Sequence, residues 1–165
     1  MIELDAIDTK IITILQEDAR ISMVNLADRV GLSETPCARR VKKLEEEGVI
    51  KQYVTLLNPE LLGMSLHVFV NVRLARPNQE SVEKFERAVR NLPQVTECYL
   101  VTGSYDYVLH ICVADVAAVK DFIRNCLISI CNLSETNSLV ALEQVKSTTA
   151  VSLKSTGMRK GRSSR

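Results

Sequence analysis

One short segment of the chain, Gly103-Ser104-Tyr105-Asp106-Tyr107, joins two apolar stretches and carries a single carboxylate. A carboxylate at the mouth of a hydrophobic strand loses hydration and needs a partner for its charge. The N–H groups of a tight turn at Gly103 could form an anion-binding concavity beside Asp106. Such a pair fits an α-amino acid, with its ammonium on Asp106 and its carboxylate on the N–H groups. Alternatively, Asp106 is a turn-former that accepts from the N–H groups of its own hairpin, and the pattern alone favours neither.

A basic cluster, Arg39, Arg40, Lys42 and Lys43, is the second group of residues that could do chemistry. It lies opposite an apolar stripe of Ala38, Val41 and Leu44. The three glutamates at 45–47 are confined to the last turn of the expected helix. A helix of this kind can place its basic N-terminal part in a DNA groove while phosphates repel its acidic end. The cluster therefore indicates a recognition helix.

Motifs for other chemistry are missing from the sequence. There is no phosphate-binding glycine loop, no G-x-S-x-G and no H-E-x-x-H. The five cysteines form no C-x-x-C pair, and we expect reduced thiols. A metal site of His110, Cys112 and Cys98 on neighbouring strands is conceivable, but packing is the commoner role of such residues. We predict no enzyme activity, no catalytic residue, no metal and no cofactor.

Composition places the chain among globular proteins. The hydrophobic fraction is 46%, enough for a sizeable core, and the formal net charge is +1. No apolar run reaches the roughly 18 residues that cross a bilayer, and the first residues are acidic. We expect a soluble cytoplasmic protein without a membrane contact. The last residues are basic and rich in Ser and Gly, so residues 153–165 are predicted to be a disordered tail.

The elements that position the basic cluster are helices. Apolar spacing predicts a first helix after Asp5, a second after Ser22 that ends at Gly31, and a third that begins near Ser33 and ends at Gly48. The short turn containing Gly31 matches the helix-turn-helix unit.

The elements that position Asp106 belong to a second pattern. Alternating residues predict strands at 66–73, 95–102, 107–115 and 137–145, and helical spacing predicts helices at 78–92 and 116–130. The order β-α-β-β-α-β is that of ferredoxin-like domains. Both faces of this sheet are apolar, and helices cover only one. We therefore predict a homodimer formed by packing of the sheets.

Four segments resemble one known family: the helical half, "NPELLG", "VTECYLVTGSYDYVL" and "LEQVK". From about Leu4 to Leu153 the chain resembles the Lrp/AsnC family of bacterial and archaeal feast/famine regulators, and "TPC" with "LLNPELLG" is most similar to its leucine-responsive branch. The resemblance implies an α+β protein with a winged helix-turn-helix domain and a ferredoxin-like βαββαβ sensing domain. It also implies dimers that assemble into octamers and bind double-stranded DNA.

The resemblance assigns domains and residues. The expected parts are residues 1–52 for DNA binding, 53–62 as an extended linker, 63–152 for effector binding and oligomerisation, and the tail. The expected recognition helix spans Ser33 to Glu47. Its candidate DNA contacts are Ser33, Thr35, Pro36, Cys37, Arg39, Arg40, Lys42 and Lys43.

The resemblance also implies an amino-acid effector bound between subunits, completed by a polar segment before the last strand of the neighbouring chain. The candidate effector residues are Val101, Thr102, Gly103, Ser104, Tyr105, Asp106, Tyr107, Thr136 and Ser138. Apolar surroundings favour leucine or methionine. Two other functions stay open from sequence: an amino-acid-binding allosteric subunit without DNA binding, and a small metal-dependent enzyme on the Cys/His strands.

Overall fold

The computed structural model describes residues 2–130 and 132–153, so the predicted tail lies outside it except for Leu153. The chain forms two compact units, which are described separately. Of the described residues, the helical unit comprises 2–55 and 146–153, and the sheet unit comprises 56–130 and 132–145. In the described residues, no helix has the length and apolar character that a membrane crossing requires.

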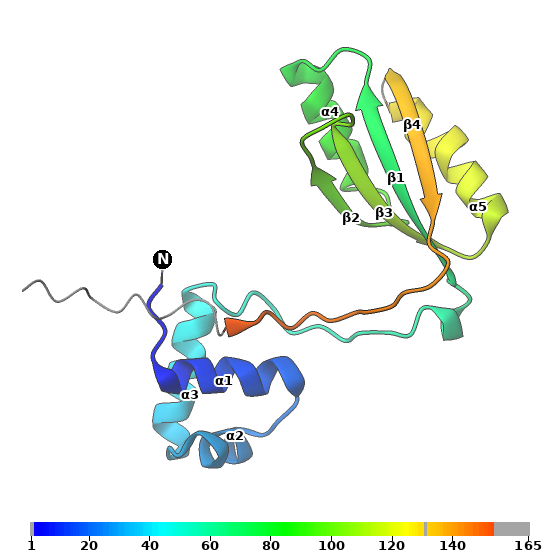
Figure 1. Ribbon diagram of the computed structural model, residues 1–165. Helices are drawn as coiled ribbons and strands as arrows, with labels where there is room; N and C mark the ends of the chain where they lie inside the picture. Colours follow the sequence, from blue (N-terminus) through cyan, green and yellow to red (C-terminus); the bar gives the residue numbers. More distant parts are fainter. Residues whose placement is uncertain (1, 131, 154–165) are drawn as a thin grey trace, which may run out of the picture. The chain divides into compact units, whose positions relative to one another are not determined.

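The helical unit contains the three predicted helices, α1 (Ala6–Glu17), α2 (Met23–Val30) and α3 (Glu34–Glu46) (Figure 1). Asp5 caps α1 by accepting from the N–H groups of Ile7 and Asp8, both at 2.8 Å. Ser22 caps α2, and Gly31 ends it in a left-handed conformation with φ of 75°. These caps satisfy donors and acceptors that a helix end leaves unpaired, which is why the sequence located the boundaries.

The core of the helical unit is formed by all three helices, with Ile11, Leu26 and Leu44 almost fully buried. The C-terminal segment also belongs to this unit. Leu153 packs on its core, and the Gln16 side chain exchanges two hydrogen bonds with the backbone of Val151. The sequence predicts residues 146–152 in the sensing domain and Leu153 in the tail, because nothing local marks the return of the chain to the helices.

The sheet unit has the predicted β-α-β-β-α-β order. Its antiparallel sheet is ordered β2-β3-β1-β4. The strands are β1 (Leu66–Leu74), β2 (Val95–Leu100), β3 (Tyr107–Val113) and β4 (Leu133–Val140). The helices are the short η1 (Glu60–Leu62), α4 (Gln79–Val89) and α5 (Val116–Asp121), the last continuing through a π-helical stretch, η2 (Phe122–Leu127), into α6 (Ile128–Ile130).

The sheet has one covered face and one open face. Helices α4 and α5 lie on the same side of it (Figure 1). Val68, Val70 and Leu109 point to that side and are fully buried. The alternate side chains form the other side, which we call the open face: His67, Phe69, Asn71, Arg73, Tyr99, Val108, His110, Cys112, Glu135, Asn137 and Leu139. Phe69 is 41% exposed there.

The last strand differs from the prediction. The sequence placed it at 137–145, but β4 spans Leu133–Val140, and Leu142 beyond it is fully exposed. β4 lies at the edge of the sheet and pairs with β1 alone, so polar side chains in it remain exposed and give no apolar alternation. Some of the hydrophobic residues on which the predicted strand was based, Leu142 and Val145, lie beyond the end of β4.

Candidate functional sites

The exposed side of α3 carries most of the predicted DNA contacts. Arg39, Lys42 and Lys43 are exposed, and Lys42 and Lys43 each form only a loose pair, at 3.7 Å, with the glutamate four residues later. Exposed pairs of this length contribute little to stability and separate readily. Ser33 and Thr35 are exposed at the start of α3, and the Ser33 side chain makes no capping hydrogen bond. These groups are available to a polyanion.

Arg40 is different, because the protein already supplies its anionic partners. Its Nη1 donates to Asp5 at 2.6 Å and to Asp8 at 2.7 Å, and its side chain is 32% exposed. The two carboxylates raise the pKa of Arg40, while the backbone N–H of Asp8 and the guanidinium lower the pKa of Asp5. Arg40 thus joins α3 to the capped N-terminus of α1.

Cys37 does not belong to the exposed surface. Its side chain is 0% exposed within the helical core, and burial raises the pKa of its thiol. The predicted DNA contact is therefore corrected to a core residue. The inward stripe of α3 is Cys37, Val41 and Leu44, whereas Ala38 is only half-buried. Helical spacing is compatible with both residues, and only packing against α1 and α2 distinguishes them.

Residues 101–107, which we call the effector turn, connect β2 to β3. Val101 N–H donates to the carbonyl of Asp106, and Asp106 N–H donates to the carbonyl of Val72, both at 2.9 Å. Gly103 has φ of 121°, a conformation that few other residues adopt. Within the described residues, the N–H groups of residues 102–105 have no hydrogen-bond acceptor. The effector turn therefore presents four consecutive amide donors.

Asp106 has one partner inside the protein. Its Oδ2 accepts from the N–H of Leu74 at 2.8 Å, where the pairing of β1 with β4 shifts register. The bond goes to β1, so Asp106 is not the hairpin turn-former that was the alternative from sequence. Its Oδ1 has no hydrogen-bond donor among the described residues. Half of the carboxylate is thus satisfied, and half is available to a ligand.

Tyr107, which the sequence predicts to bind an effector, has its side chain in the core of the sheet unit. The side chain is 2% exposed, its hydroxyl donates to Glu86 at 3.1 Å, and its ring packs on Phe85 with centroids 4.6 Å apart. Burial and the Glu86 carboxylate raise the pKa of Tyr107 to about 12. Only its backbone remains part of the effector turn.

Thr136 and Ser138 lie within β4, not in a segment that precedes the last strand. They pair with Val72 and Val70, whose side chains point to the covered face. By strand alternation Thr136 and Ser138 point to that same side. β1 lies between β4 and β3 in the sheet. The two predicted polar residues and the effector turn therefore do not converge within one chain.

Two residues that the sequence did not single out contact the effector turn. Arg73 donates from Nε and Nη2 to the carbonyl of Ser104, and its Nη1 lies 3.3 Å from Glu135. Tyr105 donates its hydroxyl to Glu135 at 2.9 Å. In the sequence, the only sign of this interaction is that Arg73 and Glu135 carry opposite charges. Their proximity can be recognised only when the register of β1 and β4 is known.

The three candidate ligands of the predicted metal-dependent alternative do not lie on one face of the sheet. His110 and Cys112 are on the open face, but Cys98 pairs with Leu109 and points to the covered face. The described residues contain no group of three or more His, Cys, Asp or Glu side chains able to hold a metal. His110 instead lies 3.0 Å from His67 through their ring nitrogens and 2.8 Å from the Thr96 hydroxyl. Burial, and then the charge of His67, lowers the pKa of His110.

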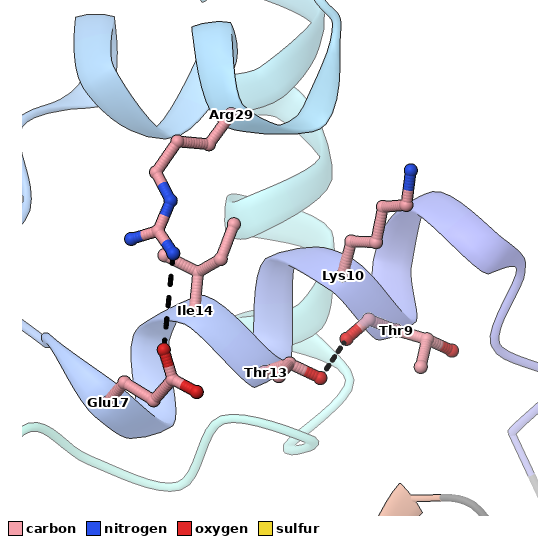
Figure 2. Close-up of a pocket in the computed structure, with 6 residues that line it drawn as sticks. All are labelled: Thr9, Lys10, Thr13, Ile14, Glu17 and Arg29. Carbon is pink, nitrogen blue, oxygen red and sulfur yellow. Dashed lines mark hydrogen bonds and ion pairs between the residues drawn. The ribbon is translucent and has the colours of Figure 1, made fainter.

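The helical unit also has an open hollow of about 270 Å³ between α1 and α2 (Figure 2). Its lining residues are Thr9, Lys10, Thr13, Ile14, Glu17 and Arg29. Figure 2 shows Arg29 of α2 directed toward Glu17 of α1, at 3.9 Å. None of the residues predicted to bind DNA or an effector lines this hollow, so it adds nothing to the two candidate sites.

Two family models match the chain. The model of a winged helix-turn-helix DNA-binding domain matches residues 4–51, and the model of the Lrp/AsnC ligand binding domain matches residues 67–151. The residues between these matches, 52–66, include η1 and end at the first residue of β1.

Whole-chain relatives agree with these models. The leucine-responsive regulatory protein of Haemophilus influenzae is 43% identical over 151 residues, covering 92% of this chain and 91% of the relative. The Escherichia coli protein of the same name is 41% identical over 152 residues, with coverage of 92% and 93%.

Solved structures give the same result. A transcriptional regulator from Neisseria meningitidis, in complex with L-methionine, superposes with a TM-score of 0.88 at 37% identity, covering 92% of this chain and 98% of that one. An AsnC family regulator from Agrobacterium tumefaciens has a TM-score of 0.87 at 40% identity, with coverage of 91% and 97%.

Proposed function

Because the chain belongs to the Lrp/AsnC family of transcriptional regulators, we propose that it binds operator DNA through α3 and that leucine or methionine controls this binding from the effector turn. The observation that carries the effector part is the geometry of residues 102–106. Four amide donors without internal acceptors lie next to a carboxylate with one free oxygen. That arrangement complements both charged groups of an α-amino acid.

The DNA-binding part rests on the surface of α3. Arg39, Lys42 and Lys43 supply positive charge that is not consumed inside the fold, and the start of the helix supplies Ser33, Thr35 and Pro36. Positive side chains that contact phosphates release counterions, which makes binding strongly dependent on salt. Arg40 acts in this proposal as the residue that holds α3 against α1.

Assembly follows from the open face. Phe69, Tyr99 and Leu139 are 41%, 57% and 55% exposed on one side of the sheet. Packing two such faces buries them, so the proposed homodimer joins the sheets of two copies. Two helix-turn-helix units then read half-sites about one helical turn apart. Dimers assemble into octamers in the cytoplasm, and a second copy supplies the polar residues that complete each effector site.

The preference for leucine or methionine rests on two observations. The L-methionine complex is formed by a regulator that is 37% identical to this chain. In addition, the turn is flanked by the apolar strands β2 and β3. A ligand must bind one assembly better than another to act as a switch, and a coupling of about 1–3 kcal/mol is typical.

The test is Asp106→Asn. An asparagine oxygen can still accept from Leu74 N–H, so the substitution removes the charge but keeps the internal bond. We expect at least a tenfold loss of affinity for leucine and methionine in isothermal titration calorimetry, because a hydrogen bond to a charged group contributes about 1.5–3 kcal/mol. DNA affinity without effector should be unchanged.

Glu80→Gln is the matched control, since it removes an exposed carboxylate from the first turn of α4. It should leave both affinities unchanged. Unaltered effector affinity in the Asp106→Asn variant would show that Asp106 is not the ammonium site. A wild-type protein that binds none of the twenty amino acids and no DNA at low salt would exclude the whole proposal.

A further inference from the structure

We propose that Arg73 is a positioning residue for the effector turn: it fixes the peptide group between Ser104 and Tyr105 so that the Tyr105 N–H faces the bound amino acid. The inference rests on the proposed effector function of this turn. It adds a residue outside the turn, on a different strand, to the machinery of ligand recognition.

Arg73 contacts the effector turn in two ways. Its Nε and Nη2 both donate to the carbonyl oxygen of Ser104. Its guanidinium carbon also lies 5.5 Å from the centroid of the Tyr105 ring, within the range of a cation–π contact. One side chain of β1 therefore holds both residues that share a single peptide group.

Glu135 of β4 completes the arrangement. It pairs with Arg73 across the strands, its Oε2 lies 3.3 Å from Arg73 Nη1, and its Oε1 accepts from the Tyr105 hydroxyl at 2.9 Å. The Glu135 carboxylate raises the pKa of Tyr105, so the hydroxyl stays protonated and remains a donor throughout the neutral range. Arg73, Tyr105 and Glu135 thus form a closed set of contacts around the carbonyl of Ser104.

The consequence for the ligand comes from the planarity of the peptide. In a trans peptide the C=O and N–H bonds point in opposite directions. Among the described residues there are no cis peptide bonds. Because the Ser104 carbonyl points at Arg73, the Tyr105 N–H points away from Arg73. This N–H is one of the four donors that lack an internal acceptor.

The neighbouring Gly103 explains why such a restraint is needed. Glycine resists rotation of its flanking peptides less than any other residue, and a Cβ built at Gly103 would meet nothing within 4 Å. A side-chain contact at this position therefore does not restrain the turn. Without Arg73, the Ser104–Tyr105 peptide would sample orientations in which its N–H no longer faces the ligand.

Arg73 and Glu135 lie on the open face, which the proposed dimer covers, but within one chain their network is too exposed to have a large effect on the fold. The side chains of Arg73 and Glu135 are 43% and 48% exposed, and ion pairs at such positions contribute little net free energy. Loss of Arg73 should therefore weaken effector binding much more than it weakens the fold. That difference separates a positioning role from a merely structural one.

The experiment compares Arg73→Lys and Arg73→Gln with the wild type. Lysine keeps the positive charge near Glu135, but it lacks the planar fork that donates twice to one carbonyl. We expect both variants to lose at least tenfold in affinity for the amino acid, leucine or methionine, that the wild type binds in calorimetry. Melting temperature and effector-free DNA affinity should stay at wild-type values. Arg90→Lys, a change at an exposed arginine at the end of α4, is the matched control.

Each other outcome is decisive. Wild-type effector affinity in Arg73→Lys would overturn the inference and leave the proposed function intact, because charge alone would then be sufficient. A parallel fall in melting temperature, DNA affinity and effector affinity would show that Arg73 is structural. A wild type that binds neither leucine nor methionine would overturn the proposed effector and this inference together.

Discussion

The two units of the molecule differ in how much of their apolar surface a single chain buries. The helical unit packs its three helices and Leu153 around one core, and it presents charge to solvent. The sheet unit covers one face and leaves Phe69 and Leu139 exposed on the other. The candidate DNA surface lies on one chain, whereas the proposed effector site and its control involve a second copy.

Individual arginine side chains also differ in whether the protein itself supplies their partners. Arg39 is exposed on α3, while Arg40, the next residue, is bound to Asp5 and Asp8. In the sheet unit, Arg73 is likewise bound to a carbonyl and a carboxylate of its own chain. A basic residue type therefore does not reveal its role, which depends on whether the fold supplies an acceptor.

The largest effect should come from a charge on the open face. Phe69→Glu places a carboxylate where two copies would pack, and an unpaired buried charge is highly unfavourable. We expect a monomer in sedimentation velocity. We also expect DNA affinity to fall by about 100-fold, because two linked helix-turn-helix units bind DNA at least that much more tightly than one.

Val116→Glu is the matched control, since Val116 is 70% exposed at the start of α5 and not on the open face. It should remain a dimer with normal DNA affinity. A dimeric Phe69→Glu protein would show that the copies associate through another surface. The open face of the sheet would then not be the dimer interface.

A smaller effect should separate Arg39 from Arg40. Arg39→Ala removes one phosphate contact, so the slope of log K against log salt should fall by about 0.9. Arg40→Ala should leave this slope unchanged and lower the melting temperature instead. Gel-shift titrations at several salt concentrations, with thermal melts, measure both quantities. An equal loss of slope in the two variants would show that Arg40 leaves its carboxylates to contact DNA.

The Arg40 effect should also depend on pH, with a sign given by Asp5. The pKa of Asp5 is lowered in the folded protein, so its stabilising effect is present above the ordinary value of 3.8 and is lost as the pH falls further. The difference in melting temperature between wild type and Arg40→Ala should therefore persist at pH 6 and shrink in strong acid. A difference that does not change with pH would indicate lost packing rather than lost charge.

The smallest effect should come from His110 on the open face. Its pKa is lowered below 6.5 by burial and by His67, while Glu97 opposes this shift. A base with a lowered pKa stabilises the fold above its ordinary pKa and loses that contribution as the pH falls. We expect the melting temperature to fall between pH 7.5 and pH 5.5 in part because of this residue. His110→Gln should flatten that dependence, and an unchanged pH profile in this variant would assign it to other groups.

The sequence by itself determined the kinds of elements and most of their ends. Asp5, Ser22 and Gly31 marked helix boundaries because capping is chemistry between residues two to four positions apart. Alternating apolar residues identified three of the four strands, since strand burial has a period of two. Asp106 was recognised as unusual because an acidic residue beside an apolar strand is visible in the order of residues alone.

Tertiary structure decided which side chains meet. The partners of Arg40 lie 32 and 35 positions away, and Arg73 reaches a carbonyl 31 positions away. The sequence predicted β4 too late in the chain and Cys37 on the surface. The position of β4 depends on its pairing with β1, and the burial of Cys37 depends on packing in the helical core. Periodicity is a property of neighbouring residues, whereas register and helix packing are set by burial of surfaces that the chain brings together only when it folds.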